Sequence, residues 1–164
     1  MFDQLLSLVK ENAGNDIINN NAIPNERNEE AIETATHSIT DSLKGAVQSG
    51  NFSDVMNLFN GGNNVSSLPL TQHMQGNFID KLMQQFGLSN SQAGGIASSI
   101  IPNVLGKLVH KTNDPNDKSF DLTSILSQFG GSGFDVSSVL NKLGSGGNNQ
   151  GGSITDSLKN ILGK

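Results

Sequence analysis

Apolar residues recur at three- and four-residue spacing along most of the chain, which predicts amphipathic helices. The longest regular stripe lies within residues 24–48 and consists of Ile32, Ala35, Ile39, Leu43, Ala46 and Val47. No segment alternates apolar and polar residues as a half-buried strand does. The expected helices cover residues 2–13, 24–48, 52–60, 70–86 and 91–110. The pattern therefore predicts an all-α fold, a compact multi-helix bundle.

Local signals mark the boundaries of these helices. Gly87 follows the fourth helix and is typical of a left-handed C-terminal stop. Ser89 and Gln92 then match a capping box, in which side chains and backbone amides at a helix start bond reciprocally. Pro102 lies within the next helix and removes a backbone donor, so we expect a kink or a division there.

A short sequence unit occurs four times. Residues 52–62 read Phe-Ser-Asp-Val-Met-Asn-Leu-Phe-Asn-Gly-Gly, and residues 120–131 resemble them. Residues 134–144 resemble them again, and 154–163 are a looser copy. A polar residue near each start supplies a helix cap, and glycine at each end supplies a stop. We therefore expect short amphipathic helices at 120–129, 134–143 and 153–162, separated by Gly-rich linkers.

A larger and weaker repeat joins these elements. A helix, a long helix and a short unit ending in Gly-Gly describe residues 1–62 and again residues 72–131. We expect an internal duplication, with residues 1–131 forming the helical bundle. Residues 132–164 would form a Gly-, Ser- and Asn-rich C-terminal tail that carries the last two short helices.

The charge distribution disfavours nucleic acid as a partner. The net charge is −5, and Arg27 is the only arginine, whereas phosphate binding needs clustered positive charge. Residues 1–62 carry nine acidic and three basic residues; the rest carries six and seven. This asymmetry is either a solvated helix surface or an electronegative patch that meets another copy.

The lack of cysteine and of long apolar runs limits the chemistry and the cellular location that we expect for the protein. There is no cysteine, which excludes disulfides and thiolate chemistry. No run of about 18 apolar residues could span a membrane, and the N-terminus lacks the basic region of a signal peptide. We expect a cytoplasmic protein, without membrane association.

Candidate catalytic and metal-binding residues are weak. His37, His73 and His110 share no ligand spacing, and Glu29, Glu30 and Glu33 suit a solvated first helical turn. Residues 113–121 are rich in side-chain oxygens but fail the EF-hand pattern, so a turn and helix cap is expected there. We predict no enzyme, no metal and no cofactor.

Residues 87–108 resemble a known family. Gly87-Leu88-Ser89, Gln92-Ala93 and Ile100-Ile101-Pro102 followed by Leu105 are similar to the YidB-like family of bacterial proteins, a domain of unknown function. The resemblance covers roughly 70–147 and implies a mostly helical protein with a Gly- and Leu-rich tail. It implies no activity, cofactor or catalytic residue.

The leading hypothesis is a non-enzymatic interaction or self-assembly module. The tail helices would bury their apolar side chains on a protein partner or on another copy, because isolated helices of about ten residues are marginal in water. The residues predicted to make this contact are Phe134, Val136, Val139, Leu140, Leu143, Ile154, Leu158, Ile161 and Leu162. The alternative is a bundle that binds a small apolar ligand in a pocket near the Pro102 kink.

Overall fold

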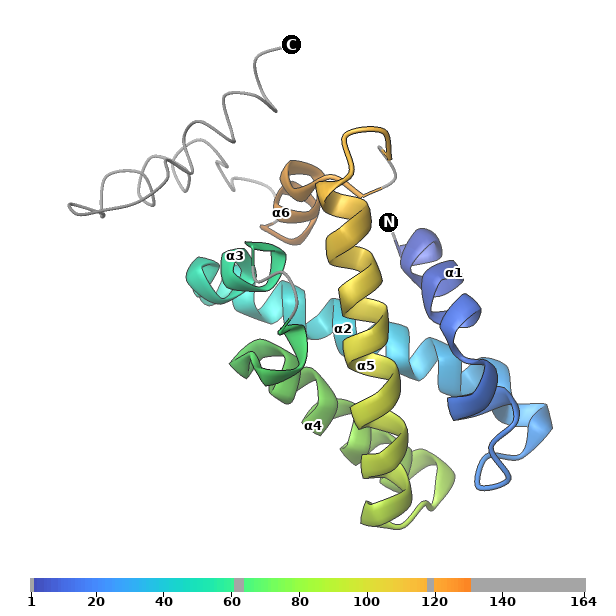
Figure 1. Cartoon of the computed structure of the whole chain (residues 1–164). Coiled ribbons are helices and arrows are strands. Elements are labelled where there is room, and N and C mark those ends of the chain that lie inside the picture. Colours follow the sequence, from blue (N-terminus) through green and yellow to red (C-terminus); the bar gives the residue numbers. More distant parts are fainter. Residues whose placement is uncertain (1, 61–63, 118–119, 131–164) are drawn as a thin grey trace.

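Helices account for the regular structure in the part of the chain that the structure describes. In the computed structural model this part comprises residues 2–60, 64–117 and 120–130. The α-helices are α1 (Phe2–Asn12), α2 (Asn28–Gln48), α3 (Phe52–Asn60), α4 (Pro69–Phe86), α5 (Asn90–Asn113) and α6 (Leu122–Gly130) (Figure 1). A π-helical turn at Gly14–Ile18 and 3₁₀ turns at Asn25–Arg27 and Val65–Ser67 connect them. The predicted all-α bundle is confirmed.

The predicted helix boundaries agree closely with the observed ones except at the start of α2. We expected that helix to begin at Pro24, but Pro24 has an extended backbone, with φ −58° and ψ 137°. The Arg27 amide donates to the Pro24 carbonyl at 2.8 Å and closes a 3₁₀ turn. The α-helix therefore begins one turn later, at Asn28.

The expected turn between α4 and α5 is present. Gly87 adopts the left-handed conformation, with φ +68°, and its amide donates to the Met83 carbonyl. The Ser89 hydroxyl accepts from the Gln92 amide at 3.3 Å, while the Gln92 side chain accepts from the Ser89 amide at 3.0 Å. The capping box is thus formed reciprocally, and it starts α5 directly after α4 ends.

Pro102 does not divide α5, which runs as one helix from Asn90 to Asn113. An interior proline costs about 3 kcal/mol of helix stability. On either side of it Ile101 and Val104 are fully buried, so burial of both halves of the helix offsets this cost. Of the expected kink or division at Pro102, the division does not occur.

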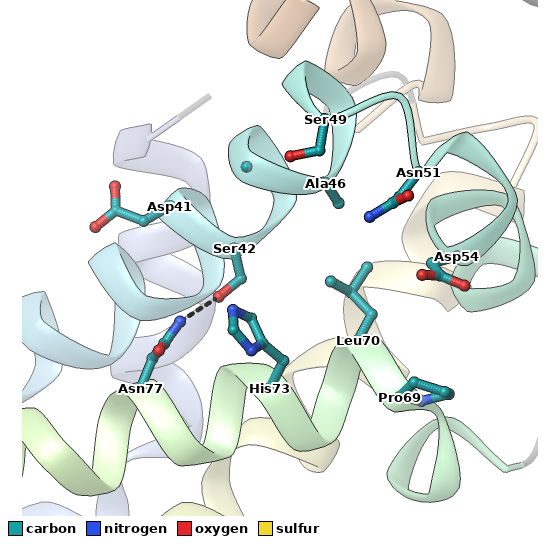
Figure 2. A pocket seen from close by; sticks show the side chains of 11 residues that line it. Asp41, Ser42, Ala46, Ser49, Asn51, Asp54, Pro69, Leu70, His73 and Asn77 are labelled. Atoms are coloured by element: carbon teal, nitrogen blue, oxygen red, sulfur yellow. Dashed lines mark hydrogen bonds between the residues drawn. The ribbon is translucent and has the colours of Figure 1, made fainter.

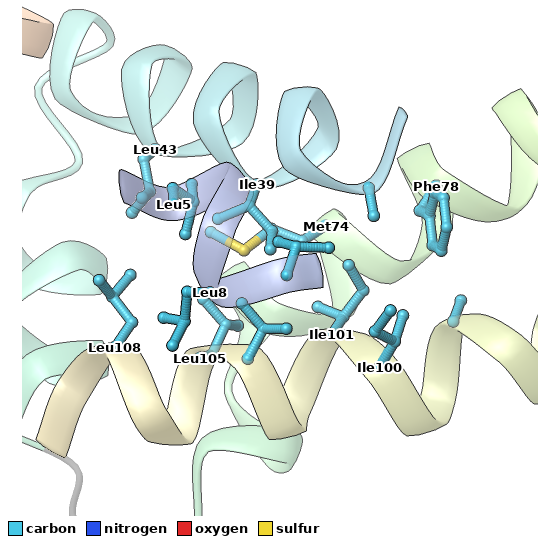
Figure 3. Packing of buried hydrophobic residues seen from close by; sticks show 14 of the residues in the cluster. Leu5, Leu8, Ile39, Leu43, Met74, Phe78, Ile100, Ile101, Leu105 and Leu108 are labelled. Carbon is cyan, nitrogen blue, oxygen red and sulfur yellow. The ribbon is translucent and has the colours of Figure 1, made fainter. Parts of the chain in front are cut away.

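The core lies where α1, α2, α4 and α5 converge. Figure 3 shows their apolar side chains pointing into one interior, and the largest fully buried ones include Ile39, Met74, Phe78, Ile101 and Leu105. Here α4 packs against α5 and α2, and α1 packs against the same two long helices. The two short helices lie on this frame, α3 against α2, α4 and α5, and α6 against α2.

None of the described helices is both long enough and apolar enough to cross a membrane.

The order helix, long helix, short helix occurs twice along the described residues. The boundary between bundle and tail at residue 131 and the internal duplication stay predictions. The expected helices at 134–143 and 153–162 lie outside the described residues.

Candidate functional site

A groove lies between the last turns of α2, the start of α3 and the first turns of α4. Its volume is about 430 Å³. We call it the polar groove, and Figure 2 shows its side chains. It is lined by Asp41, Ser42, Gly45, Ala46, Ser49, Asn51, Asp54, Pro69, Leu70, His73 and Asn77.

The floor of the polar groove is fixed by packing and by one hydrogen bond. Ser42, Ala46 and Leu70 are buried. The Asn77 side-chain amide donates to the Ser42 hydroxyl at 3.1 Å, which ties α4 to α2 across the floor. The floor is therefore part of the bundle's packing.

The rim of the polar groove carries the charge. Asp41 accepts a hydrogen bond from Lys81 at 3.4 Å, and Asp54 lies at the start of α3. His73, on α4, is exposed and lines the same groove. The rim can accept hydrogen bonds and attract a cationic group. Within residues 2–60, 64–117 and 120–130, no cluster of three or more His, Asp or Glu side chains could hold a metal ion.

Arg27 is engaged within the fold. Its guanidinium donates to both carboxylate oxygens of Glu30, at 2.8 and 2.7 Å, and to the Gln85 carbonyl at 2.8 Å. The hydrogen bond from Arg27 lowers the pKa of Glu30, and the same bond raises the pKa of Arg27. Arg27 thus fastens the start of α2 to the end of α4, a structural role.

The other polar candidates have ordinary structural roles too. The His37 ring packs against Phe2, with centroids 4.7 Å apart, and Glu29 pairs with Lys10 at 2.6 Å on the surface. In the oxygen-rich segment, Asp121 accepts from the Thr123 amide at 2.9 Å and caps α6. The Asp114 carboxylate accepts from the Asn116 amide, also at 2.9 Å, and forms a turn. The expected turn and helix cap are present.

The predicted contact residues of the tail lie outside the described residues, so they stay a prediction: Phe134, Val136, Val139, Leu140, Leu143, Ile154, Leu158, Ile161 and Leu162. Around Pro102, the side chains of Ile100, Ile101 and Leu105 are fully buried in the core. The polar groove does not include them, so it does not support the alternative of an apolar ligand site there.

Sequence reasoning did not identify the polar groove. Its residues come from three helices and from the turn after α2, with no spacing that marks a site. The one available signal is the group of small residues at the end of α2, namely Gly45, Ala46 and Ser49, which leaves room beside that helix.

Comparison with known proteins identifies a family for this chain. The model of a family described as "Bacterial protein of unknown function (DUF937)" matches residues 69–164, more than half of the chain. This confirms the expected resemblance to YidB-like proteins. No curated protein and no solved structure matches.

Proposed function

This chain belongs to the DUF937 family of bacterial proteins of unknown function, and we propose that it acts as a non-enzymatic interaction or self-assembly module. In this proposal residues 134–143 and 153–162 form short helices. Their apolar side chains bind a protein partner or a second copy of the chain. The proposal places the protein in the bacterial cytoplasm and includes neither a cofactor nor a nucleic acid.

The observation that carries the proposal is the docking of α3 and α6, which have the same sequence unit as the tail segments. In α3, Val55, Met56, Leu58 and Phe59 are buried. In α6, Ile125, Leu126 and Phe129 are buried. Both helices have only nine residues and lie against the long helices of the bundle. A unit of this kind is thus suited to bind a helical surface, and the tail carries two more copies.

The surface of the bundle also supports the proposal. Among the described residues, the large hydrophobic side chains that are exposed are Ile18 and Met83, at 39% and 37%. No other large hydrophobic side chain of the described residues is exposed to this extent, so an extensive apolar contact with another protein would draw on the tail. Arg27 is engaged with Glu30, which supports a proposal that does not include nucleic acid.

The test is the mass of the full-length protein in solution. Light scattering across a dilution series should give a concentration-dependent oligomer for the wild type. The double variant Leu140→Ala with Leu158→Ala should self-associate more weakly, so that its oligomer dissociates at protein concentrations at which the wild-type oligomer persists. The reason is that it removes one central apolar side chain from each tail segment.

The matched control is Asn141→Ala with Lys159→Ala, which changes the polar positions of the same segments and should leave the mass unchanged. An affinity pull-down from a bacterial lysate extends the test to other partners. The same mass at every concentration and the same captured proteins for wild type and double variant would contradict the proposal.

A further inference from the structure

Each buried residue of α5 has a buried counterpart on α2, which buries Ile32 and Thr36 in addition. When the two sequences are aligned so that Ala31 of α2 matches Ala93 of α5, every buried residue of α5 is aligned with a buried residue of α2. At every fourth residue of this series the two helices also carry the same residue type: Ala31 and Ala93, Ala35 and Ala97, Ile39 and Ile101, Leu43 and Leu105, and Val47 and Val109. The two long helices therefore share one burial register.

The first and the short helices repeat the correspondence. Buried residues that follow one another at four-residue spacing on α4 match a buried series that runs from α1 into the π-helical turn: Leu70, Met74, Phe78 and Leu82 against Leu5, Val9, Ala13 and Ile17. All the buried residues of α6 match buried residues of α3: Ile125, Leu126 and Phe129 against Val55, Met56 and Phe59. We call residues 2–60 the first half and residues 69–130 the second half.

Two pairs of contacts between the halves are reciprocal, whereas the packing of α3 on α4 has no equally extensive counterpart between α6 and α1. The helix α4 packs against α2, and its counterpart α1 packs against α5. The helix α6 packs against α2, and its counterpart α3 packs against α5. Exchanging the two halves therefore preserves these pairings, as in a two-fold dimer whose subunits are joined in one chain.

The side chains between the halves differ in size in a complementary way. On α2, the buried row that faces α4 is small and polar: Thr34, Ser38 and Ser42. The Thr34 hydroxyl bonds the Gln85 side chain at 3.1 Å and the Ser42 hydroxyl bonds Asn77 at 3.1 Å, which fixes this orientation. The matching row of α5 is bulky and apolar: Ile96, Ile100 and Val104.

The first helices of the two halves differ in the opposite direction. Phe78 and Met74 on α4 correspond to Ala13 and Val9 in the first half, and all four are fully buried. Phe78 follows Asn77, the partner of Ser42, and so lies at the height of the small row on α2. The helix that packs on the small row of α2 thus carries the larger side chains. The smaller side chains are Val9 in α1 and Ala13 directly after it. These elements pack on α5, which carries the bulky row.

We propose that the two halves are diverged copies of one unit and that the contact between them is a recognition surface for the unlike half. A pair of second halves would set Phe78 against a bulky row such as Ile100, and overpacked cores are destabilised. A pair of first halves would set Ala13 against Ser38 and leave a cavity. Second copies of the chain can therefore use this surface only by exchanging unlike halves. This proposal does not rest on the tail.

The first test moves bulk from α4 to α2 in the full chain. Phe78→Ala should lower the midpoint of thermal unfolding by about 10 °C, and Ser38→Ile should lower it too. The double variant gives these two positions the residues, alanine and isoleucine, that stand at their counterparts Ala13 and Ile100. It should recover at least half of the summed loss. Phe59→Ala with Ser38→Ile is the control, because Phe59 lies on α3 and the two losses should add.

The second test asks for recognition between chains. Full-length Ser38→Ile and Phe78→Ala chains, one of them isotopically labelled, are refolded together at high concentration and measured by native mass spectrometry. A mixed dimer that neither variant forms alone is expected, because exchange of halves restores one wild-type contact and one size-exchanged contact. Additive losses in the double variant, or a mixture that contains only monomers, would overturn the proposal. A double variant that does not fold would also overturn it.

Discussion

The guanidinium of Arg27 lies over the ring of Phe86, with its central carbon 4.2 Å from the ring centroid. Arg27 comes directly before α2, and Phe86 is the last residue of α4. With the hydrogen bonds to Glu30 and to the Gln85 carbonyl, this contact closes one end of the bundle. It joins the first half to the second at a site distant from the polar groove.

Substitution of Arg27 by lysine should weaken this closure although it keeps the charge. Lysine cannot form the planar, two-pronged contact with Glu30 or stack in the same way on Phe86. Arg27→Lys should therefore lower the thermal midpoint slightly, and Arg27→Gln should lower it further. Equal midpoints for wild type and Arg27→Lys, measured by circular dichroism, would show that the geometry contributes nothing.

The Glu30 carboxylate should make stability depend on acid pH. Its pKa in the folded protein is lowered from an ordinary value of 4.5, first of all by the hydrogen bond from Arg27. Its contribution is therefore fully present above that ordinary value and is lost as pH falls through the lower folded pKa. In urea titrations from pH 7 downwards, Glu30→Gln should flatten this part of the profile. The effect is small because the pair is exposed, and a profile unchanged by the substitution would contradict the assignment.

Two glycines should respond in opposite directions to alanine. Gly87 has a left-handed backbone, so Gly87→Ala should cost about 1 kcal/mol of unfolding free energy. Gly94 lies inside α5, and a methyl group added there would meet no neighbouring side chain within 4 Å. Gly94→Ala should therefore stabilise the protein by roughly 0.5–1 kcal/mol. Urea unfolding of both variants measures this directly. Changes of the same sign would mean that one of the two backbone conformations is different in solution.

Removal of the proline in α5 should stabilise the bundle. Pro102 is half-buried and interrupts the backbone hydrogen bonds of a helix that continues past it. Pro102→Ala should raise the unfolding free energy by roughly 1–3 kcal/mol, up to the cost of an interior proline. A lower free energy in denaturant titration would instead indicate that the ring of Pro102 fills space that alanine leaves empty.

Much of the fold could be predicted from the sequence because its signals are local. Helical spacing, the glycine stop at Gly87 and the Ser89 capping box each depend on a few neighbouring residues. The polar groove could not be predicted, since Asp41, Asp54 and His73 become neighbours only when three helices pack. The persistence of α5 through Pro102 likewise depends on tertiary burial, which outweighs a local preference.

The tight turn from Gly87 to Gln92 also has a consequence for the order of folding. It joins α4 and α5 with a stop signal and a start signal in immediate succession, so this helical hairpin closes a short loop and loses little chain entropy. We predict that it forms in the transition state, ahead of the contacts with α1. Ser89→Ala should then mainly slow refolding, whereas Leu5→Ala should mainly speed unfolding. Stopped-flow kinetics that give the opposite division would place the folding nucleus in the first half.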